Sequence, residues 1–402
     1  MDFPLQTKLS KQCPDKAPFL CGQRTPARGL CVKTRKQCKV RTSTLRNVPV
    51  PTEENTKGKN FGYLEDDLGR SCYLSPSNLK LDYHETYPDG EHVPDNFSCL
   101  SYNIWGLAKD TKLKGLFSMR QPILEKTLKD TKADILCLQE MSTWAYDELD
   151  KTNFFSTYKF QSEKPLTFKK EERNRGLEVF LLSKYKPSSV SIYGFKGVLG
   201  YSNSVMIVTY PNLVIYNLYN QAGSKYSPGQ EHKWLHYSRC RYDILNSIYD
   251  IFQKNHKNNN CILLGDFNFD LDGTDKDWPE KVMLNKFMRS NFVDTYRNLY
   301  PNVKKYPCFT EDTEINLMRY NQKLIEKMVR FDGVFFRSVD KKQKIKSSKM
   351  IGLEPRCLNK DETIWFLENM AGSKNIDDLR TCKPGHLSIH PSDHFGILTT
   401  FG

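Results

Sequence analysis

The chain has 402 residues, enough for one large α/β domain with appendages or for two to three average domains. With 38% hydrophobic and 12% aromatic residues it has ample core material, which excludes a chain disordered throughout, and no run reaches the roughly 20 apolar residues that a membrane-spanning helix needs. The formal net charge of +13 favours an anionic partner such as nucleic acid, phospholipid headgroups or phosphorylated metabolites, or else a lysine-rich surface that serves solubility alone.

The N-terminal segment, residues 1–60, is predicted to be a basic tail or a small module. Its first fifty residues contain eleven Lys and Arg against two acids, with no helical or strand periodicity. Four cysteines lie here without any C-x-x-C pair, namely Cys13, Cys21, Cys31 and Cys38. A zinc module, a disulfide-stapled segment and unpaired thiols all stay open. The start of the chain has no apolar stretch typical of a signal peptide, so we expect an intracellular, soluble protein.

Residues 61–95 are acidic and interrupted by turn residues, which predicts a linker or a lid before the main domain at 96–402. In that domain we predict strands in the runs FSCLSYNI, DILCLQE, LEVFLLS, SVMIVTY, LVIYNL, CILLGD, VRFDGVFF and FGILTTF. We predict helices over 116–130, 235–254 and 361–371. Arg239 and Arg241 on the second helix are interpreted as solvated, with contact to a phosphate as the alternative. The stretch from about 338 to 388 is interpreted as an insertion near a strand end.

Polar side chains stand where five of these strands end or begin: Asn103, Glu140, Asp266, Asn268, Asp332, Asp393 and His394. A cap or turn role would explain any one of them, but so many together favour a shared site. Oxygen ligands without cysteine or clustered histidine suit a hard cation, Mg²⁺ or Mn²⁺. Such a cation beside a carboxylate and a histidine suits metal-assisted attack of water on phosphorus, with no covalent nucleophile.

The motifs SYNIWGL, CLQE, NRGLEVFLLSK, LLGDFN, RFDGV and PSDHF, in this order, resemble the endonuclease/exonuclease/phosphatase superfamily. That superfamily includes pancreatic-deoxyribonuclease-like nucleases, abasic-site endonucleases, inositol phosphatases and neutral sphingomyelinases. The resemblance covers residues 97–402, and the strand motifs look most like those of the sphingomyelinase-like branch. It implies an α/β four-layer sandwich, in which two mixed β-sheets pack face to face and helices cover both outer sides.

The resemblance also implies a metal site and a catalytic set. Glu140 is expected to bind Mg²⁺ with Asn103 beside it, and Asp393 is expected to complete the site directly or through water.

In the implied catalytic set, Asp266 positions or deprotonates the attacking water, and Asn268 holds that water or a phosphate oxygen. His394 contacts the scissile phosphate, and Asp332 fixes the tautomer of His394 and raises its basicity.

One residue departs from the family pattern. Where sphingomyelinase-like members usually carry the histidine of T-H-L-Q-A, this chain has Tyr219 in the run NLYNQAG, as abasic-site endonucleases do. A phenol can donate a hydrogen bond to a phosphoryl oxygen, but its pKa near 10 makes it a poor proton shuttle at neutral pH. Either Tyr219 belongs to the catalytic set, or it only packs and the enzyme is weakened.

The leading hypothesis is a Mg²⁺-dependent phosphodiesterase whose substrate is either a nucleic acid backbone or a phospholipid headgroup. The basic charge and Tyr219 favour nucleic acid, whereas the strand motifs favour lipid. The alternative is a weak or inactive member of the fold that binds nucleic acid or serves as a structural virion or assembly protein. The bias towards Lys, Asn, Tyr and Ile, with only seven alanines, is typical of AT-rich genomes such as those of some large DNA viruses or protists.

Overall fold

The computed structural model describes residues 79–106, 110–164, 179–196, 202–223, 231–273, 279–316, 318, 328–339, 343–370, 381–383 and 386–402. It also describes two short antiparallel strand pairs nearer the N-terminus. These are β1 (Phe19–Cys21) with β2 (Leu30–Val32), and β3 (Leu64–Glu65) with β4 (Ser71–Cys72). Most of the predicted tail, including Cys13 and Cys38, lies outside the described residues.

The larger of the two main sheets has seven strands. Their order is β14 (Val293–Asp294), β17 (Asp332–Arg337), β13 (Asn260–Asp266), β12 (Leu213–Tyr219), β11 (Ser202–Thr209), β10 (Ser189–Lys196) and β5 (Leu79–Thr86). Only β12 and β13 run parallel to each other, and every other neighbouring pair is antiparallel. The sheet is therefore mixed.

The second main sheet has six strands. Their order is β18 (Ile345–Ile351), β22 (Gly396–Phe401), β6 (Phe97–Asn103), β7 (Ile135–Gln139), β9 (Val179–Ser183) and β8 (Phe160–Gln161). Here β6 and β7 form the one parallel pair. Each sheet thus contains a single parallel pair whose two strands end at the same edge.

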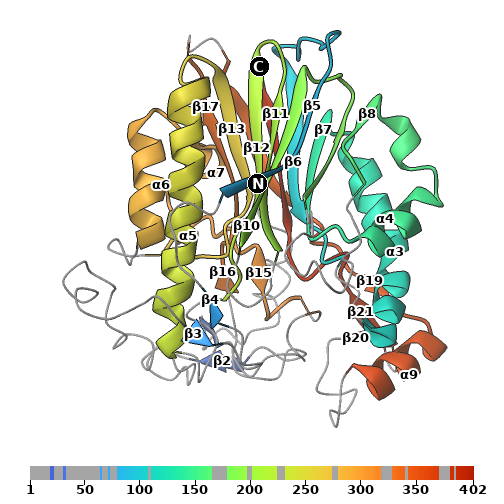
Figure 1. Cartoon of the computed structure of the whole chain (residues 1–402). Coiled ribbons are helices and arrows are strands. Elements are labelled where there is room, and N and C mark those ends of the chain that lie inside the picture. Colours follow the sequence, from blue (N-terminus) through green and yellow to red (C-terminus); the bar gives the residue numbers. More distant parts are fainter. Residues whose placement is uncertain are drawn as a thin grey trace.

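Helices cover the outer face of each sheet (Figure 1). On the seven-stranded sheet lie α5 (Glu231–Ile251), continued by a π-helical turn η5 (Phe252–His256), and α6 (Pro279–Arg289). On the six-stranded sheet lie α3 (Thr111–Thr131) and α4 (Thr143–Asp150). The predicted four-layer α/β sandwich is confirmed, and the predicted helices fall on α3, on α5 with η5, and on α9 (Lys360–Asn369). Among the described residues, no helix is both long and apolar enough to cross a bilayer.

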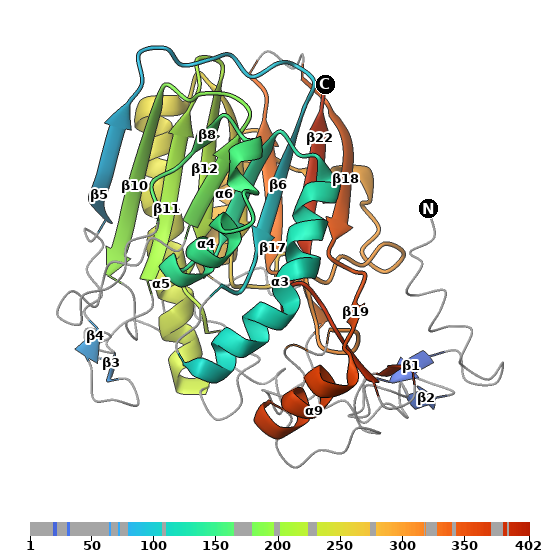
Figure 2. The same ribbon diagram turned by 90° about the vertical axis from the view of Figure 1, so that its right-hand side faces the viewer.

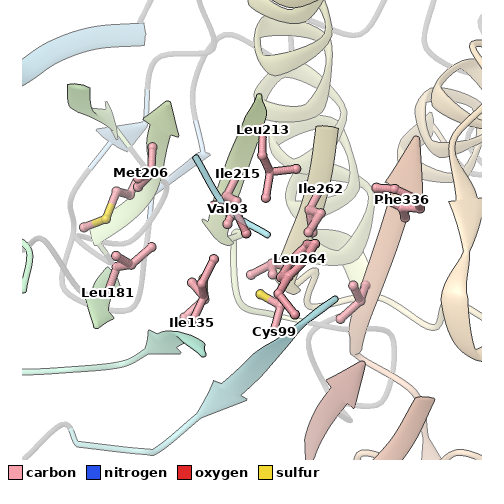
Figure 3. Close-up of a cluster of buried hydrophobic side chains, with 14 of the residues drawn as sticks. Val93, Cys99, Ile135, Leu181, Met206, Leu213, Ile215, Ile262, Leu264 and Phe336 are labelled. Atoms are coloured by element: carbon pink, nitrogen blue, oxygen red, sulfur yellow. The ribbon is translucent and has the colours of Figure 1, made fainter. Parts of the chain in front are cut away.

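The main hydrophobic core fills the space between the two sheets (Figure 3). Every second side chain along these strands points into this core, from both sheets, as expected for two sheets packed face to face. Ile135 and Leu181 come from the six-stranded sheet, and Ile215 and Leu264 from the seven-stranded sheet; all four are fully buried. This core holds the two sheets at the separation on which any site built from both sheets depends.

The prediction of a linker or lid at 61–95 is wrong for the second half of this segment. Residues 79–86 form β5, the edge strand that pairs with β10 (Figure 2). Tyr83 and Val93 pack against the core between the sheets. The acidic residues and prolines of this stretch hide a two-residue alternation of Leu79, Leu81 and Tyr83, which is a strand pattern. The main fold therefore begins before residue 96.

The predicted insertion at 338–388 also begins too early. Residues 345–351 form β18, which pairs with β22 at the edge of the six-stranded sheet. Its lysines suit an edge strand, because charged side chains at an edge discourage pairing with other chains. The added unit follows Gly352 and comprises β19 (Arg356–Cys357), α9, β20 (Thr381–Lys383) and β21 (His386–Ile389). Leu358, Phe366 and their neighbours form a separate small core there.

We predict that Leu264→Ala will destabilise the protein by about 2–5 kcal/mol, because it opens a cavity between the two sheets. The control is Val282→Ala on the surface of α6, where the side chain is 50% exposed and the expected change is within about 0.5 kcal/mol. Urea unfolding followed by circular dichroism measures both. Equal losses for the two variants would contradict the assignment of this core.

Candidate active site

The polar residues predicted from the strand ends meet at one edge of the sandwich. Asn103 is the last residue of β6, and Glu140 directly follows β7, its parallel partner. Asp266 ends β13 and lies opposite Asp332, the first residue of the antiparallel β17. Because an antiparallel strand begins where its neighbour ends, strand ends and strand starts meet at the same edge.

Asn103 joins the two sheets within the site. Its side-chain nitrogen Nδ2 donates to Glu140 Oε1 and to Asp266 Oδ2, each at 3.0 Å. The Tyr219 hydroxyl, at the end of β12, donates to the same Glu140 oxygen at 2.9 Å. All four side chains are buried. The predicted metal-binding carboxylate is thus fixed by one donor from each sheet.

Asp266 and Asn268 form a tight turn after β13. The backbone N–H of Asn268 donates to Asp266 Oδ1 at 2.8 Å, and Asn268 Nδ2 donates to Asp266 Oδ2 at 3.2 Å. Asn268 Nδ2 also reaches the carbonyl of Asn220 at 3.0 Å. Asn268 has a φ of 54°, a left-handed conformation that asparagine tolerates better than most residues. The asparagine therefore allows the chain to turn while it orients the Asp266 carboxylate.

His394 pairs with Asp332, close to Asp266. The His394 Nδ1 atom lies 2.8 Å from Asp332 Oδ2, and both side chains are buried. Since a carboxylate only accepts, Nδ1 carries the proton. Asp266, Asp332 and His394 each offer a ligand atom, and these atoms all lie within 4.8 Å of one another. The structure therefore brings Glu140, Asp266 and His394, which the sequence predicts to converge, to the same edge of the sandwich.

Burial and mutual repulsion shift the pKa values of these groups. Burial, with Asp332 and Glu140 nearby, raises the pKa of Asp266 to about 8 when no cation is bound. Burial alone would lower the pKa of His394, but the charge and hydrogen bond of Asp332, with Asp266 and Asp393, raise it to about 10. Around neutral pH, the imidazole is therefore a cation and a proton donor.

The donor set of this site fits a hard divalent cation. The carboxylates of Glu140, Asp266, Asp332 and Asp393 are buried close together, which is unfavourable without positive charge. Asp332 Oδ1 is buried and accepts no hydrogen bond within the described part of the chain. Carboxylate and amide oxygens with one imidazole suit Mg²⁺ or Mn²⁺ rather than a structural zinc. Asp393 lies beside this cluster, where its Oδ1 accepts from the Ser392 hydroxyl at 3.3 Å.

Comparison with known protein families identifies this arrangement. The sequence model of the endonuclease/exonuclease/phosphatase family matches residues 100–312, more than half of the chain. The chain belongs to this family. Members of the endonuclease/exonuclease/phosphatase family are divalent-metal-dependent phosphoester hydrolases, so the protein is an enzyme of that class. A comparison with curated proteins found no significant match.

Solved structures share the fold at low sequence identity. SmcL is 14% identical with a TM-score of 0.50, over 77% of this chain and 100% of SmcL. An endonuclease/exonuclease/phosphatase family protein from Bacteroides thetaiotaomicron is 12% identical with a TM-score of 0.50, over 77% of this chain and 98% of that protein. A humanized D. rerio TDP2 is 17% identical with a TM-score of 0.49, over 77% of this chain and all of that chain.

Arg120 and Arg241 are buried and support the site, but the sequence does not predict these roles. Arg120 on α3 donates to the carbonyls of Ile104 and Pro391 at 2.7 and 2.6 Å, which links the segment after Asn103 to the segment before His394.

Arg241 was predicted to be solvated, and this is wrong. It is 2% exposed, pairs with Glu280 on α6 at 2.9 Å, and donates to the carbonyls of Gln221 and Gly223 beyond Tyr219. Arg239, two residues earlier, is half exposed, as predicted. Arg120 is held by backbone carbonyls and Arg241 by carbonyls and Glu280, all outside the helix that carries the arginine, so no local pattern reveals them.

A buried ion-pair network lies under the loop that follows Asn268. Arg330, two residues before Asp332, binds Asp272 at 3.1 Å and Asp294 at 2.8 Å. Arg297 binds Asp272 as well, at 2.8 Å. Burial would raise the pKa of Asp272, but Arg297 and Arg330 outweigh it and lower the pKa below its usual value. The network ties the site loop to the strand that carries Asp332.

Because the folded pKa of Asp272 lies below its unfolded value of about 3.9, its stabilising effect is complete above that value and is lost as the pH falls through the folded pKa. We therefore expect Asp272→Asn to destabilise the protein by about 3 kcal/mol at pH 7, because the buried arginines lose a charged partner. The difference from the wild type should shrink towards pH 3. Thermal unfolding between pH 3 and pH 7 measures this, with the exposed Asp130→Asn as control. A pH-independent difference would contradict the assignment.

Proposed function

We propose that this family member is a Mg²⁺-dependent phosphodiesterase that hydrolyses its substrate by direct in-line attack of water. The observation that carries the proposal is the position of Asp266. It lies within 4.8 Å of the His394–Asp332 pair and shares the amide of Asn103 with Glu140. A base and a proton donor thus flank one small volume in which a phosphate group can be held.

Glu140, Asn103 and Asp393 are proposed to hold the cation, which supplies positive charge for the non-bridging phosphate oxygens. Asp266 then holds the attacking water and accepts its proton. In the cation's field the pKa of this carboxyl falls below its metal-free value near 8, which favours the ionised form that accepts a proton.

The remaining proposed roles concern orientation and charge. Asn268 keeps the Asp266 carboxylate in place through its backbone and side-chain nitrogens. His394, protonated at neutral pH, donates from Nε2 to a phosphate oxygen as negative charge develops there. Asp332 holds the imidazole in that orientation through Nδ1. No side chain needs to form a covalent bond with phosphorus.

Tyr219 is proposed to act on Glu140 rather than on the phosphate. Its hydroxyl donates to Glu140 Oε1, where it shares that oxygen with Asn103. A phenol in this position orients a metal-binding carboxylate, as outer hydrogen-bond donors commonly do. This contact gives the tyrosine a function that does not require it to replace the usual histidine as a proton shuttle.

For the substrate we favour a nucleic acid backbone. The chain has 60 Lys and Arg against 47 Asp and Glu, and phosphate contacts dominate nucleic-acid affinity. A plasmid-nicking assay run beside hydrolysis of labelled sphingomyelin vesicles, each with Mg²⁺ and with EDTA, separates the two substrate classes. Metal-dependent nicking without lipid cleavage is the expected result. Lipid cleavage without nicking would move the assignment to phospholipid headgroups.

The catalytic roles are tested with Asp266→Asn and His394→Gln in the assay that detects wild-type activity. We expect kcat to fall by about 10²-fold or more, because each change removes a group that acts in the transition state. The matched control is Asp130→Asn on α3, whose carboxylate is exposed and pairs with Lys126 on the surface. If both site variants retain wild-type rates with their fold intact, the proposed mechanism is wrong.

Tyr219→Phe is expected to weaken Mg²⁺ affinity about 10-fold while kcat at saturating Mg²⁺ stays within about 3-fold of wild type. The reason is that the change removes the hydroxyl that donates to Glu140 Oε1. Tyr216→Phe on the same strand is the control, since its hydroxyl instead contacts His256 at 2.5 Å. A titration of rate against Mg²⁺ concentration measures the effect. A kcat that stays low at saturating Mg²⁺ would indicate direct action of Tyr219 on the substrate.

A further inference from the structure

The catalytic pair His394–Asp332 spans the two sheets. Asp332 begins β17 of the seven-stranded sheet, whereas His394 lies just before β22 of the six-stranded sheet. The 2.8 Å contact between them therefore depends on how the ends of two strands from different sheets are held together. Apolar packing between the sheets is non-directional and cannot by itself fix a contact of this kind.

One buried threonine holds both strand ends. Thr310 Oγ1 accepts hydrogen bonds from the backbone N–H groups of Phe331 at 2.9 Å and Asp332 at 3.0 Å. The carbonyl of Thr310 accepts from the N–H of Phe395, next to His394, at 2.7 Å. Thr310 is fully buried. We propose that Thr310 is a positioning residue that sets the His394–Asp332 geometry, an inference that rests on the function proposed above for this pair.

Neighbouring contacts strengthen the same link. Asn316, six residues further along, donates from Nδ2 to the carbonyl of Ser392 at 2.8 Å. The Ser392 hydroxyl in turn donates to the carbonyl of Asn103 at 2.7 Å. The ring of Phe331 lies 6.3 Å from the imidazole of His394, measured between ring centroids. A shift of the backbone at Phe331 would therefore reach His394 through packing as well as through Asp332.

The chemistry of the side chain explains why a hydroxyl is needed here. A threonine oxygen has two lone pairs, so it can accept from both N–H groups at once. Valine has nearly the same shape but no acceptor, so both buried N–H groups would lose the oxygen to which they donate. The start of β17 would then move so that these N–H groups reach other acceptors. A displacement of about 1 Å at a catalytic group is enough to lower a rate by up to about 10²-fold.

The experiment compares Thr310→Val with Thr310→Ser and with a matched control, Thr295→Val, in the full-length chain. Thr295 on α7 (Thr295–Leu299) is also fully buried, and its hydroxyl contacts Thr399 at 3.1 Å. Both valine variants should lower the melting temperature. If Thr310→Val fails to fold, Thr310→Cys replaces it, because a thiol is of similar size and a weak acceptor.

Two measurements distinguish positioning from general destabilisation. We expect Thr310→Val to lower kcat about 10- to 100-fold with KM within about 3-fold, whereas Thr310→Ser and Thr295→Val stay near wild type. Proton NMR supplies a readout that needs no substrate. The low-field Nδ1–H signal of His394, assigned by its loss in His394→Gln, should persist in Thr310→Ser and Thr295→Val and shift or disappear in Thr310→Val.

The inference is overturned if Thr310→Val keeps this signal, or if its loss of activity is no greater than that of Thr295→Val. Its failure is distinct from failure of the proposed function. If the wild type hydrolyses no phosphoester with Mg²⁺ or Mn²⁺, the proposed function fails, and the NMR comparison still decides whether Thr310 sets the His394–Asp332 contact.

Discussion

The site depends on a single amide that stands between two carboxylates of different sheets. Asn103 Nδ2 has two hydrogens, and it donates one to Glu140 and the other to Asp266. Without this donor, two buried carboxylates would face each other across the gap between the sheets, where repulsion is poorly screened. A neutral donor reduces that repulsion and adds no charge of its own. It leaves the negative potential that attracts a divalent cation.

The buried acids of the site lower the stability of the folded state, and packing elsewhere in the fold compensates for this loss. A large apolar core lies between the sheets, and two further cores lie under the helices on either side. The left-handed backbone of Glu140 and Asn268, with φ of 56° and 54°, adds strain directly after the strands. Such strain persists only where the surrounding contacts hold it, and here rigid parallel strands lead into both residues.

Many residues of this site could be predicted because each lies at the end of a short run of sequence that is itself recognisable as a strand. A buried strand that ends in a polar residue shows both the strand and its functional end, as in the runs that lead to Glu140 and Asp266. The contacts that orient the site are different in kind. Arg120 binds backbone carbonyls, which every residue possesses, and Arg241 binds carbonyls and Glu280 on another helix, so nothing in the local sequence marks the partners. The edge strand β5 was hidden because charge and proline outweighed a short alternation of apolar residues.

Directional polar contacts between the sheets explain how the two halves of the site keep their spacing. In the space between the sheets, Gln139 Nε2 donates to Asn217 Oδ1 at 2.7 Å, and Asn217 Nδ2 donates to the carbonyl of Phe180 at 3.2 Å. Gln139 directly precedes Glu140, and Asn217 lies two residues before Tyr219. Apolar side chains around them tolerate small slips, because their attraction depends on area rather than direction. A slip of these amides would leave buried polar atoms without partners, each at about 1–3 kcal/mol. The apolar core therefore supplies most of the stability, and the buried amides fix the register that brings Glu140, Tyr219 and Asp266 together.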